Sequence, residues 1–160
     1  MATLSKITPC LWFDEQSEEA ATFYTGIFDN SRILQVSHYT AVGPRPDGMV
    51  LMVIFELDGQ EFTALNGGPE FTFDEAISFQ VNCDSQEEID RFWTALSEGG
   101  EEGPCGWLKD KFGVSWQIVP ALMNDVLGDP DAQKRDRVMK AVLSMGKLDL
   151  AELQRAADDA

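Results

Sequence analysis

The feature that most constrains the fold of this chain is an internal repeat. Ser17–Thr25 aligns with Gln86–Thr94 at a constant offset of 69 residues, so that Phe23 is equivalent to Phe92. Four of the nine positions are identical, and each copy carries a second aromatic residue beside its Phe. A repeat of this length indicates one supersecondary unit built twice, which restricts the architecture more than any short motif does.

Each copy of the repeat is predicted to form a strand, a turn and a helix. The apolar runs Ile7–Phe13 and Ile77–Val81 precede the two helix-like segments and favour strands. The second helix has a capping box at Ser85-x-x-Glu88 and is expected to end at Gly99-Gly100. Its apolar residues recur at spacings of three and four, which predicts one buried face.

Further strands complete a βαβββ pattern in each half. Three segments after the first helix are rich in β-branched and aromatic residues, and the dipeptide between the last two is a hairpin signal: Arg32–Tyr39, Met49–Leu57, Gln60–Leu65 and Asp58-Gly59. In the shorter second half, the turn Lys109–Gly113 precedes the strand Val114–Val119. The fold class is therefore expected to be α+β, with paired βαβββ modules followed by a helical C-terminal tail.

The whole chain, 1–160, is expected to form a single domain. Its parts are a first half, a linker, a second half and a helical tail, at 1–66, 67–76, 77–120 and 121–160. The tail is predicted to be helical over Leu122–Leu127, Asp131–Met145 and Leu148–Ala157, with Gly128-Asp129-Pro130 and Gly146 between the helices. The tail could pack on the outside of the sheet or on a second subunit, and the sequence does not decide between these.

Charge and composition exclude several kinds of partner. The formal net charge of −16 repels phosphate backbones and anionic lipid surfaces, so neither nucleic acid nor a membrane is an expected partner. No apolar run is long enough to cross a bilayer, and no signal-peptide core follows Met1–Lys6, which predicts a cytoplasmic protein. Cys10, Cys83 and Cys105 form no CxxC pair and are expected to be reduced thiols, the first two as small buried side chains.

Several motifs together resemble a known family. They are Ile7–Phe13, Glu19-Ala20-x-x-Phe23-Tyr24, Leu65-Asn66-Gly67-Gly68-Pro69 and Cys105–Pro120, which includes Gly113-Val-Ser-Trp-Gln-Ile-Val-Pro120. In these segments the chain resembles the PhnB-like branch of the vicinal oxygen chelate superfamily, whose domains are described as 3-demethylubiquinone-9 3-methyltransferase-like. Glyoxalase I, bleomycin-resistance proteins and extradiol dioxygenases are members of the same superfamily. The resemblance implies the glyoxalase/bleomycin-resistance fold, a cupped ligand cavity and a homodimer.

The resemblance also implies where a metal would be bound. Metal-dependent members place four ligands on paired strands, and these carry over to Pro9, Thr63, Ser78 and Gln117. Proline has no ligating side chain, and the other three supply only neutral oxygens, whereas tight transition-metal sites use imidazole, carboxylate or thiolate. We therefore expect no metal and no other cofactor.

The methyltransferase description is not supported by the residues. Transfer of a methyl group from S-adenosylmethionine uses a Gly-rich loop after a first strand, with an acidic residue that binds the ribose. The Gly-containing segment Asn66–Pro69 instead lies between the two halves and is predicted to be a turn.

The remaining candidate site residues favour binding of a small molecule. A cavity lined by aromatic and neutral polar groups would suit a flat or partly apolar ligand, and the candidates are Trp12, Thr63, Asn66, Ser78, Trp107, Trp116 and Gln117. Possible acid or base residues are His38, Lys109 and Asp110, although no Ser/His/acid set or activated Cys accompanies them. Three functions stay open: a non-catalytic binder, a metal-independent enzyme, and a subunit whose main role is dimerisation, with the halves or the tail exchanged.

Overall fold

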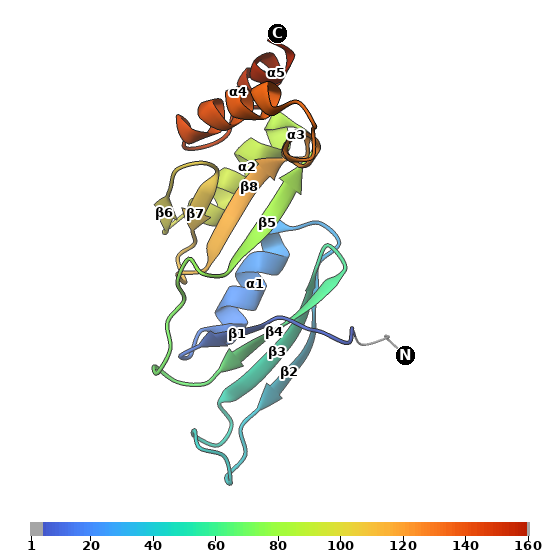
Figure 1. The fold of residues 1–160 in the computed structure, drawn as a ribbon. Helices are drawn as coiled ribbons and strands as arrows, with labels where there is room; N and C mark the ends of the chain where they lie inside the picture. The colour runs from blue at the N-terminus through green and yellow to red at the C-terminus, as the bar shows by residue number, and fades with distance from the viewer. Residues whose placement is uncertain (1–4, 160) are drawn as a thin grey trace. The chain divides into compact units, whose positions relative to one another are not determined.

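The computed structural model describes residues 5–159 and divides into two compact units, Met1–Thr72 and Phe73–Ala160 (Figure 1). Within its described residues the first unit contains one helix and one sheet, with the elements β1 (Cys10–Phe13), α1 (Ser17–Ile27), β2 (Arg32–His38), β3 (Val50–Leu57) and β4 (Gln60–Asn66). The strand order is β1-β4-β3-β2, with β1 parallel to β4 and the other pairs antiparallel.

Helix α1 covers one face of the first sheet. Tyr24 stacks on Phe55 with ring centroids 6.3 Å apart, and Phe55 stacks on Phe62 at 5.6 Å. Because side chains alternate along a strand, the neighbours of Phe55 and Phe62 in sequence lie on the opposite, open face. The hairpin between β3 and β4 turns at Asp58 and Gly59, which have φ angles of 49° and 77°. These are the two left-handed positions of a tight hairpin turn, as the sequence predicts.

The second unit repeats this topology and adds the tail. Its elements are β5 (Ser78–Cys83), α2 (Gln86–Ser97), β6 (Glu101–Glu102), β7 (Trp107–Lys109), β8 (Ser115–Pro120), α3 (Leu122–Leu127), α4 (Ala132–Leu143) and α5 (Leu150–Asp158). The strand order β5-β8-β7-β6 is equivalent to that of the first sheet, with β5 parallel to β8. The expected α+β class with paired modules and C-terminal helices is confirmed, whereas the single domain and the duplicated sequence stay predictions.

The start of helix α2 follows the predicted capping box with one difference. Ser85 Oγ accepts a hydrogen bond from the Glu88 N–H at 3.2 Å. The Glu88 carboxylate, however, accepts from the Asp84 N–H at 2.7 Å, one residue before the cap. The Ser85 bond satisfies a backbone donor that a helix start leaves free, and the Glu88 bond satisfies the N–H of the residue before the cap.

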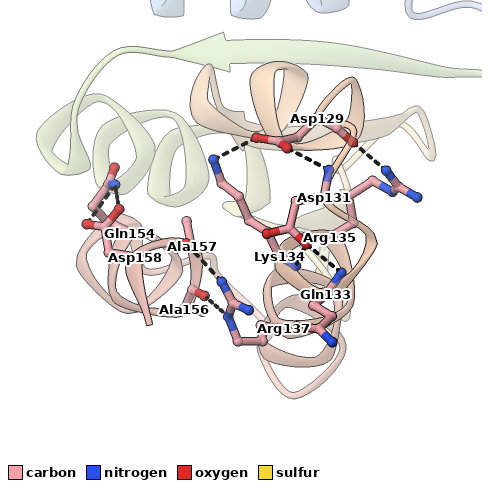
Figure 2. A network of polar contacts seen from close by, with 10 residues as sticks. All are labelled: Asp129, Asp131, Gln133, Lys134, Arg135, Arg137, Gln154, Ala156, Ala157 and Asp158. Carbon is pink, nitrogen blue, oxygen red and sulfur yellow. Dashed lines mark hydrogen bonds and ion pairs between the residues drawn. The ribbon is translucent and has the colours of Figure 1, made fainter. Parts of the chain in front are cut away.

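The tail helices have an apolar core of their own. Val138 and Val142 of α4 pack with Leu153 of α5, and Val119 at the end of β8 belongs to the same cluster. Polar contacts also connect residues of the tail helices (Figure 2). Among them, the Lys134 ammonium pairs with the Asp129 carboxylate at 2.8 Å, and this pair lowers the pKa of Asp129.

Two groups of these polar contacts in the tail lie at helix ends. Asp131 accepts from the backbone N–H groups of Gln133 and Lys134 at the start of α4. The Arg137 guanidinium donates to the carbonyls of Ala156 and Ala157, at 2.9 and 3.2 Å, in the last turn of α5. A cation there complements the negative end of the helix dipole.

The tail is attached to helix α2 as well as to β8. The Gln86 side chain donates to the Leu148 carbonyl at 3.2 Å and accepts from the Leu150 N–H at 2.8 Å. Lys147 pairs with Asp90 of α2 at 2.7 Å, and this pair lowers the pKa of Asp90. The tail therefore packs on the second unit of its own chain.

Several details differ from the sequence expectations or had no sequence signal. The first strand begins at Cys10 rather than Ile7, and Cys10 is exposed rather than buried. Its side chain lies on the face opposite to Leu11 and Phe13, which pack under α1. The two-residue strand β6 has no apolar pattern in the sequence.

Among residues 5–159, no helix has the length and apolar composition needed to span a lipid bilayer.

Candidate functional site

The open face of the first sheet carries residues in rows across the strands. Pairing of the strands places Trp12, Leu65, Met52 and Ser37 in one row. The next row contains Cys10, Thr63, Ile54 and Gln35. The third holds Glu61, Glu56 and Arg32, the last two forming an ion pair of 3.1 Å. The face is thus apolar and aromatic at one end and charged at the other.

Trp12 is fixed at the apolar end by the segment after β4. Its indole Nε1 donates to the Gly68 carbonyl at 2.9 Å, and the ring meets Phe71 edge-on with centroids 5.0 Å apart. A Cβ atom on Gly67 would lie 2.3 Å from the Trp12 ring, so this position has no room for a side chain. The glycines of the Asn66–Pro69 segment therefore serve the packing of Trp12.

Asn66 lies on the helix-covered side of β4 and is 2% exposed. Its Oδ1 accepts from the Ser17 N–H at 2.8 Å, and its Nδ2 donates to the Val50 carbonyl at 3.1 Å. The Tyr39 hydroxyl donates to the Asn66 backbone carbonyl at 2.7 Å. Since Gln16 makes no side-chain cap, Asn66 caps α1 from 49 residues away. The side chain proposed from the sequence as a ligand contact thus holds α1, β3 and β4 together.

Thr63 and His38 occupy less enclosed positions of the first unit. Thr63 is half-buried on the open face, beside Ile54, while its backbone N–H donates to the Pro9 carbonyl at 2.9 Å. His38 is exposed at the end of β2.

On the second sheet, Ser78 and Gln117 lie on the face away from α2. Gln117 Nε2 donates to Ser78 Oγ at 2.9 Å, and both side chains are half-buried. Trp107 of β7 pairs directly with Gln117, so it shares this face. The structure therefore brings together three of the residues that the sequence proposed as ligand contacts.

Trp116 and Asp110 are buried on the helix side of the second sheet. Asp110 is 3% exposed, and its carboxylate accepts from the Trp116 indole at 2.8 Å and from the N–H groups of Phe112 and Val114 at 2.8 and 3.1 Å. The Trp116 ring also contacts Phe79, with centroids 5.4 Å apart. The proposed base and the proposed ligand contact thus form a structural unit at the β7–β8 turn.

Lys109 differs from Asp110 in facing the open side. Its ammonium pairs with the Glu75 carboxylate, and this hydrogen bond raises the pKa of Lys109 and lowers the pKa of Glu75. Lys109 pairs across the strands with Ser115, which the sequence analysis did not single out. Both line a pocket of about 160 Å³. A small buried Ser beside an aromatic strand residue has no sequence signature of its own.

The side chains at the positions where the family resemblance implies metal ligands do not fit a metal. Ser78 and Gln117 offer neutral oxygens and are hydrogen-bonded to each other. Within the part of the chain that the structure describes, no three His, Cys, Asp or Glu side chains gather as a metal site would require. Nor does the Gly67-Gly68 segment fit S-adenosylmethionine, because it follows β4, packs on Trp12 and does not open a helix.

The chain is similar to several known proteins. The family described as 3-demethylubiquinone-9 3-methyltransferase matches residues 5–119. The PhnB protein from Bacillus cereus, whose structure carries the same methyltransferase name, is 40% identical, covers 73% of this chain and 100% of its own, and has a TM-score of 0.66. No curated protein matches the chain.

Two more distant structures share the fold. Protein PA1353 from Pseudomonas aeruginosa is 21% identical, with coverage of 73% of this chain and 98% of its own and a TM-score of 0.60. The fosfomycin resistance protein FosX from Mesorhizobium loti is 13% identical, with coverage of 81% and 99% and a TM-score of 0.57. At these identities the similarity shows the fold alone.

Proposed function

The chain belongs to the 3-demethylubiquinone-9 3-methyltransferase family, a PhnB-like branch of the vicinal oxygen chelate superfamily, and from this premise we propose that it is a non-catalytic binder of a small, partly aromatic or apolar molecule. The binding surface is the open face of the first sheet. The family description names an activity, but residues 5–159 provide neither a loop for S-adenosylmethionine nor a strong metal-ligand set.

The observation that carries the proposal is the row Trp12, Leu65 and Met52 on the open face. An aromatic ring and two flexible or branched apolar side chains form a surface that a flat molecule can cover. Trp12 is held in place by its bond to Gly68 and by Phe71, so little side-chain freedom is lost on binding. Thr63, in the next row, supplies a hydroxyl that can orient a polar group of the ligand.

Binding without catalysis agrees with the state of the three candidate acid or base residues. Asp110 is buried and accepts three hydrogen bonds, two from backbone N–H groups after it and one from the Trp116 indole of β8. Lys109 is paired with Glu75, which keeps its ammonium protonated and makes it a poor base. His38 is exposed at the end of β2. A homodimeric state and a cytoplasmic location stay predictions from the sequence.

The experiment is a fluorescence titration with N-phenyl-1-naphthylamine, a flat and uncharged probe that the acidic chain does not repel. We expect saturable binding to the full chain. Met52→Lys, which places a charge within the apolar row, should weaken binding about tenfold or more, because burying an unpaired ammonium is costly. Leu65→Gln is a milder second variant for the case in which Met52→Lys unfolds.

The matched control is Ile33→Lys, which changes an apolar β2 residue that is 37% exposed and pairs with Phe55 on the helix side. This variant should bind the probe as the unmodified chain does. Equal loss in Met52→Lys and Ile33→Lys, or no saturable binding at all, would refute the proposal. Small aromatic compounds that raise the melting temperature should be recovered unchanged by mass spectrometry, and their conversion would favour a metal-independent enzyme instead.

A further inference from the structure

The second unit contains a separate pocket, of about 160 Å³, that the proposed function does not use. It lies beside β6, β7 and the start of β8, and its charged and polar lining consists of Glu75, Glu101, Glu102, Trp107, Lys109 and Ser115. All of these residues belong to the Phe73–Ala160 unit, so the pocket does not depend on the first unit.

Ser115 is the unusual member of this lining. The residue is 1% exposed, and its Oγ has no hydrogen-bond partner in the structure. A buried hydroxyl without a partner costs free energy, and native proteins contain few of them. Ser115 lines the pocket and faces the same side of the sheet as Lys109, away from the buried ring of Trp116.

The charges around Ser115 select the kind of molecule. Three carboxylates and one ammonium line the pocket, and Glu102 also accepts from the Trp93 indole at 2.9 Å. The Lys109 ammonium lies in the field of Glu75, Glu101 and Asp74, which raises its pKa. The surplus of negative charge, on a chain of net charge −16, disfavours an anion and favours a cation.

We propose that this pocket binds the primary ammonium group of a small organic amine. Ser115 Oγ accepts a hydrogen bond from the ammonium, and the carboxylates of Glu75 and Glu101 supply the opposite charge. The Trp107 indole provides an aromatic wall, which attracts cations and covers the apolar part of the amine. This inference is independent of the apolar ligand proposed for the first sheet.

A catalytic role for Ser115 and Lys109 is disfavoured by the same geometry. A Ser–Lys pair needs a neutral lysine to remove the hydroxyl proton. Glu75 holds Lys109 in the protonated form, so the pair is suited to binding rather than to nucleophilic attack.

The test follows the Trp107 indole N–H signal of the ¹⁵N-labelled full chain by NMR, with Trp107→Phe used to assign it among the four Trp signals. At neutral pH three probes of similar shape are titrated: benzylamine, benzyl alcohol and benzoate. Benzylamine should shift the Trp107 signal in a saturable way and more strongly than the other two. A signal that benzylamine does not move, or that benzyl alcohol moves equally, overturns the proposal.

Two variants with matched controls test the assigned roles. Ser115→Ala should weaken benzylamine binding roughly tenfold, because it removes a hydrogen bond to a charged group. Ser144→Ala, which removes an exposed hydroxyl bonded to Ala141 in the tail, should have no effect. An unchanged affinity in Ser115→Ala overturns the assignment.

Lys109→Met removes the competing ammonium and should tighten benzylamine binding severalfold. Lys147→Met, which breaks the Asp90 pair outside the pocket, is its control and should leave the affinity unchanged. If benzoate binds instead, and Lys109→Met abolishes that binding, the pocket is an anion site and the proposal is wrong. All measurements of amine binding follow the Trp107 signal of the second unit, whereas the proposed function is tested by N-phenyl-1-naphthylamine binding and the Met52→Lys variant. Failure of one proposal is therefore distinguishable from failure of the other.

Discussion

Gln117 donates a hydrogen bond of 2.9 Å from its side-chain amide to the hydroxyl of Ser78, joining the adjacent parallel strands β5 and β8 on their open side. The family resemblance carries metal ligands to these two positions. In this chain the two side chains share one hydrogen bond, and a cation bound at these positions would gain only neutral oxygen donors.

Metal ions are therefore expected to leave the stability of the protein unchanged. A site that binds metal at a thousandfold excess over its Kd would add about 4 kcal/mol to the free energy of unfolding. We expect no measurable change in Tm when zinc, nickel or manganese salts are added, or when a chelator is added to the purified protein. A stoichiometric metal that survives dialysis, and whose removal lowers the Tm, would contradict this expectation.

Asn66→Ala is expected to destabilise the first unit by about 2–3 kcal/mol, because it leaves the buried Ser17 N–H and Val50 carbonyl without their partner. Urea unfolding followed by circular dichroism measures the change. Thr63→Val is the control, since Thr63 is half-buried on the open face of the same strand and should change the stability by much less. Equal effects in both variants would show that Asn66 does not cap α1 in the way described.

The cysteines are expected to react with thiol reagents at very different rates. Burial raises the pKa of Cys83 to about 12, and the residue is 1% exposed, so almost no thiolate is present at pH 8. Cys10 is exposed and should react first. Labelling with 5,5′-dithiobis(2-nitrobenzoate), with Cys10→Ser and Cys83→Ser to assign the phases, tests the order. Rapid labelling of Cys83 in the folded protein would refute the described packing.

The attachment of the tail should weaken in acid. Hydrogen bonds from the Lys147 ammonium, which has the larger effect, and from the Gln86 amide lower the pKa of Asp90 in the folded state below its unfolded value. A depressed carboxylate pKa stabilises the fold at pH values above the unfolded pKa, and this contribution is lost as the pH falls through the folded value. Asp90→Asn should therefore have a lower Tm than the unmodified chain at pH 7, with the difference shrinking below about pH 4.

Lys147→Met provides the reciprocal measurement. It removes the same pair, so its Tm difference from the unmodified chain should shrink over the same acid range. A difference that persists unchanged into acid would mean that the substitution acts through packing of the Lys147 stem rather than through charge.

The local signals of the sequence determined the elements and their order. Asp58-Gly59 specifies a tight hairpin because both positions require left-handed backbone, and Ser85 specifies a helix start because its hydroxyl reaches a free N–H three residues on. These interactions span a few residues and depend little on the rest of the chain. The family motifs added the equivalence of the two sheets, which the strand order confirms.

Only the tertiary structure decided what the polar site residues do. Asn66 caps a helix that begins 49 residues earlier, and Asp110 accepts the Trp116 indole in the core, so neither side chain is left for a ligand on the open face. Cys10 is exposed and Ser115 is buried, although both lie in strands of mostly apolar residues. The alternation of a strand fixes which residues share a face, but which face the helix covers, and which hydroxyl is left without a partner, depends on contacts between segments far apart in the chain.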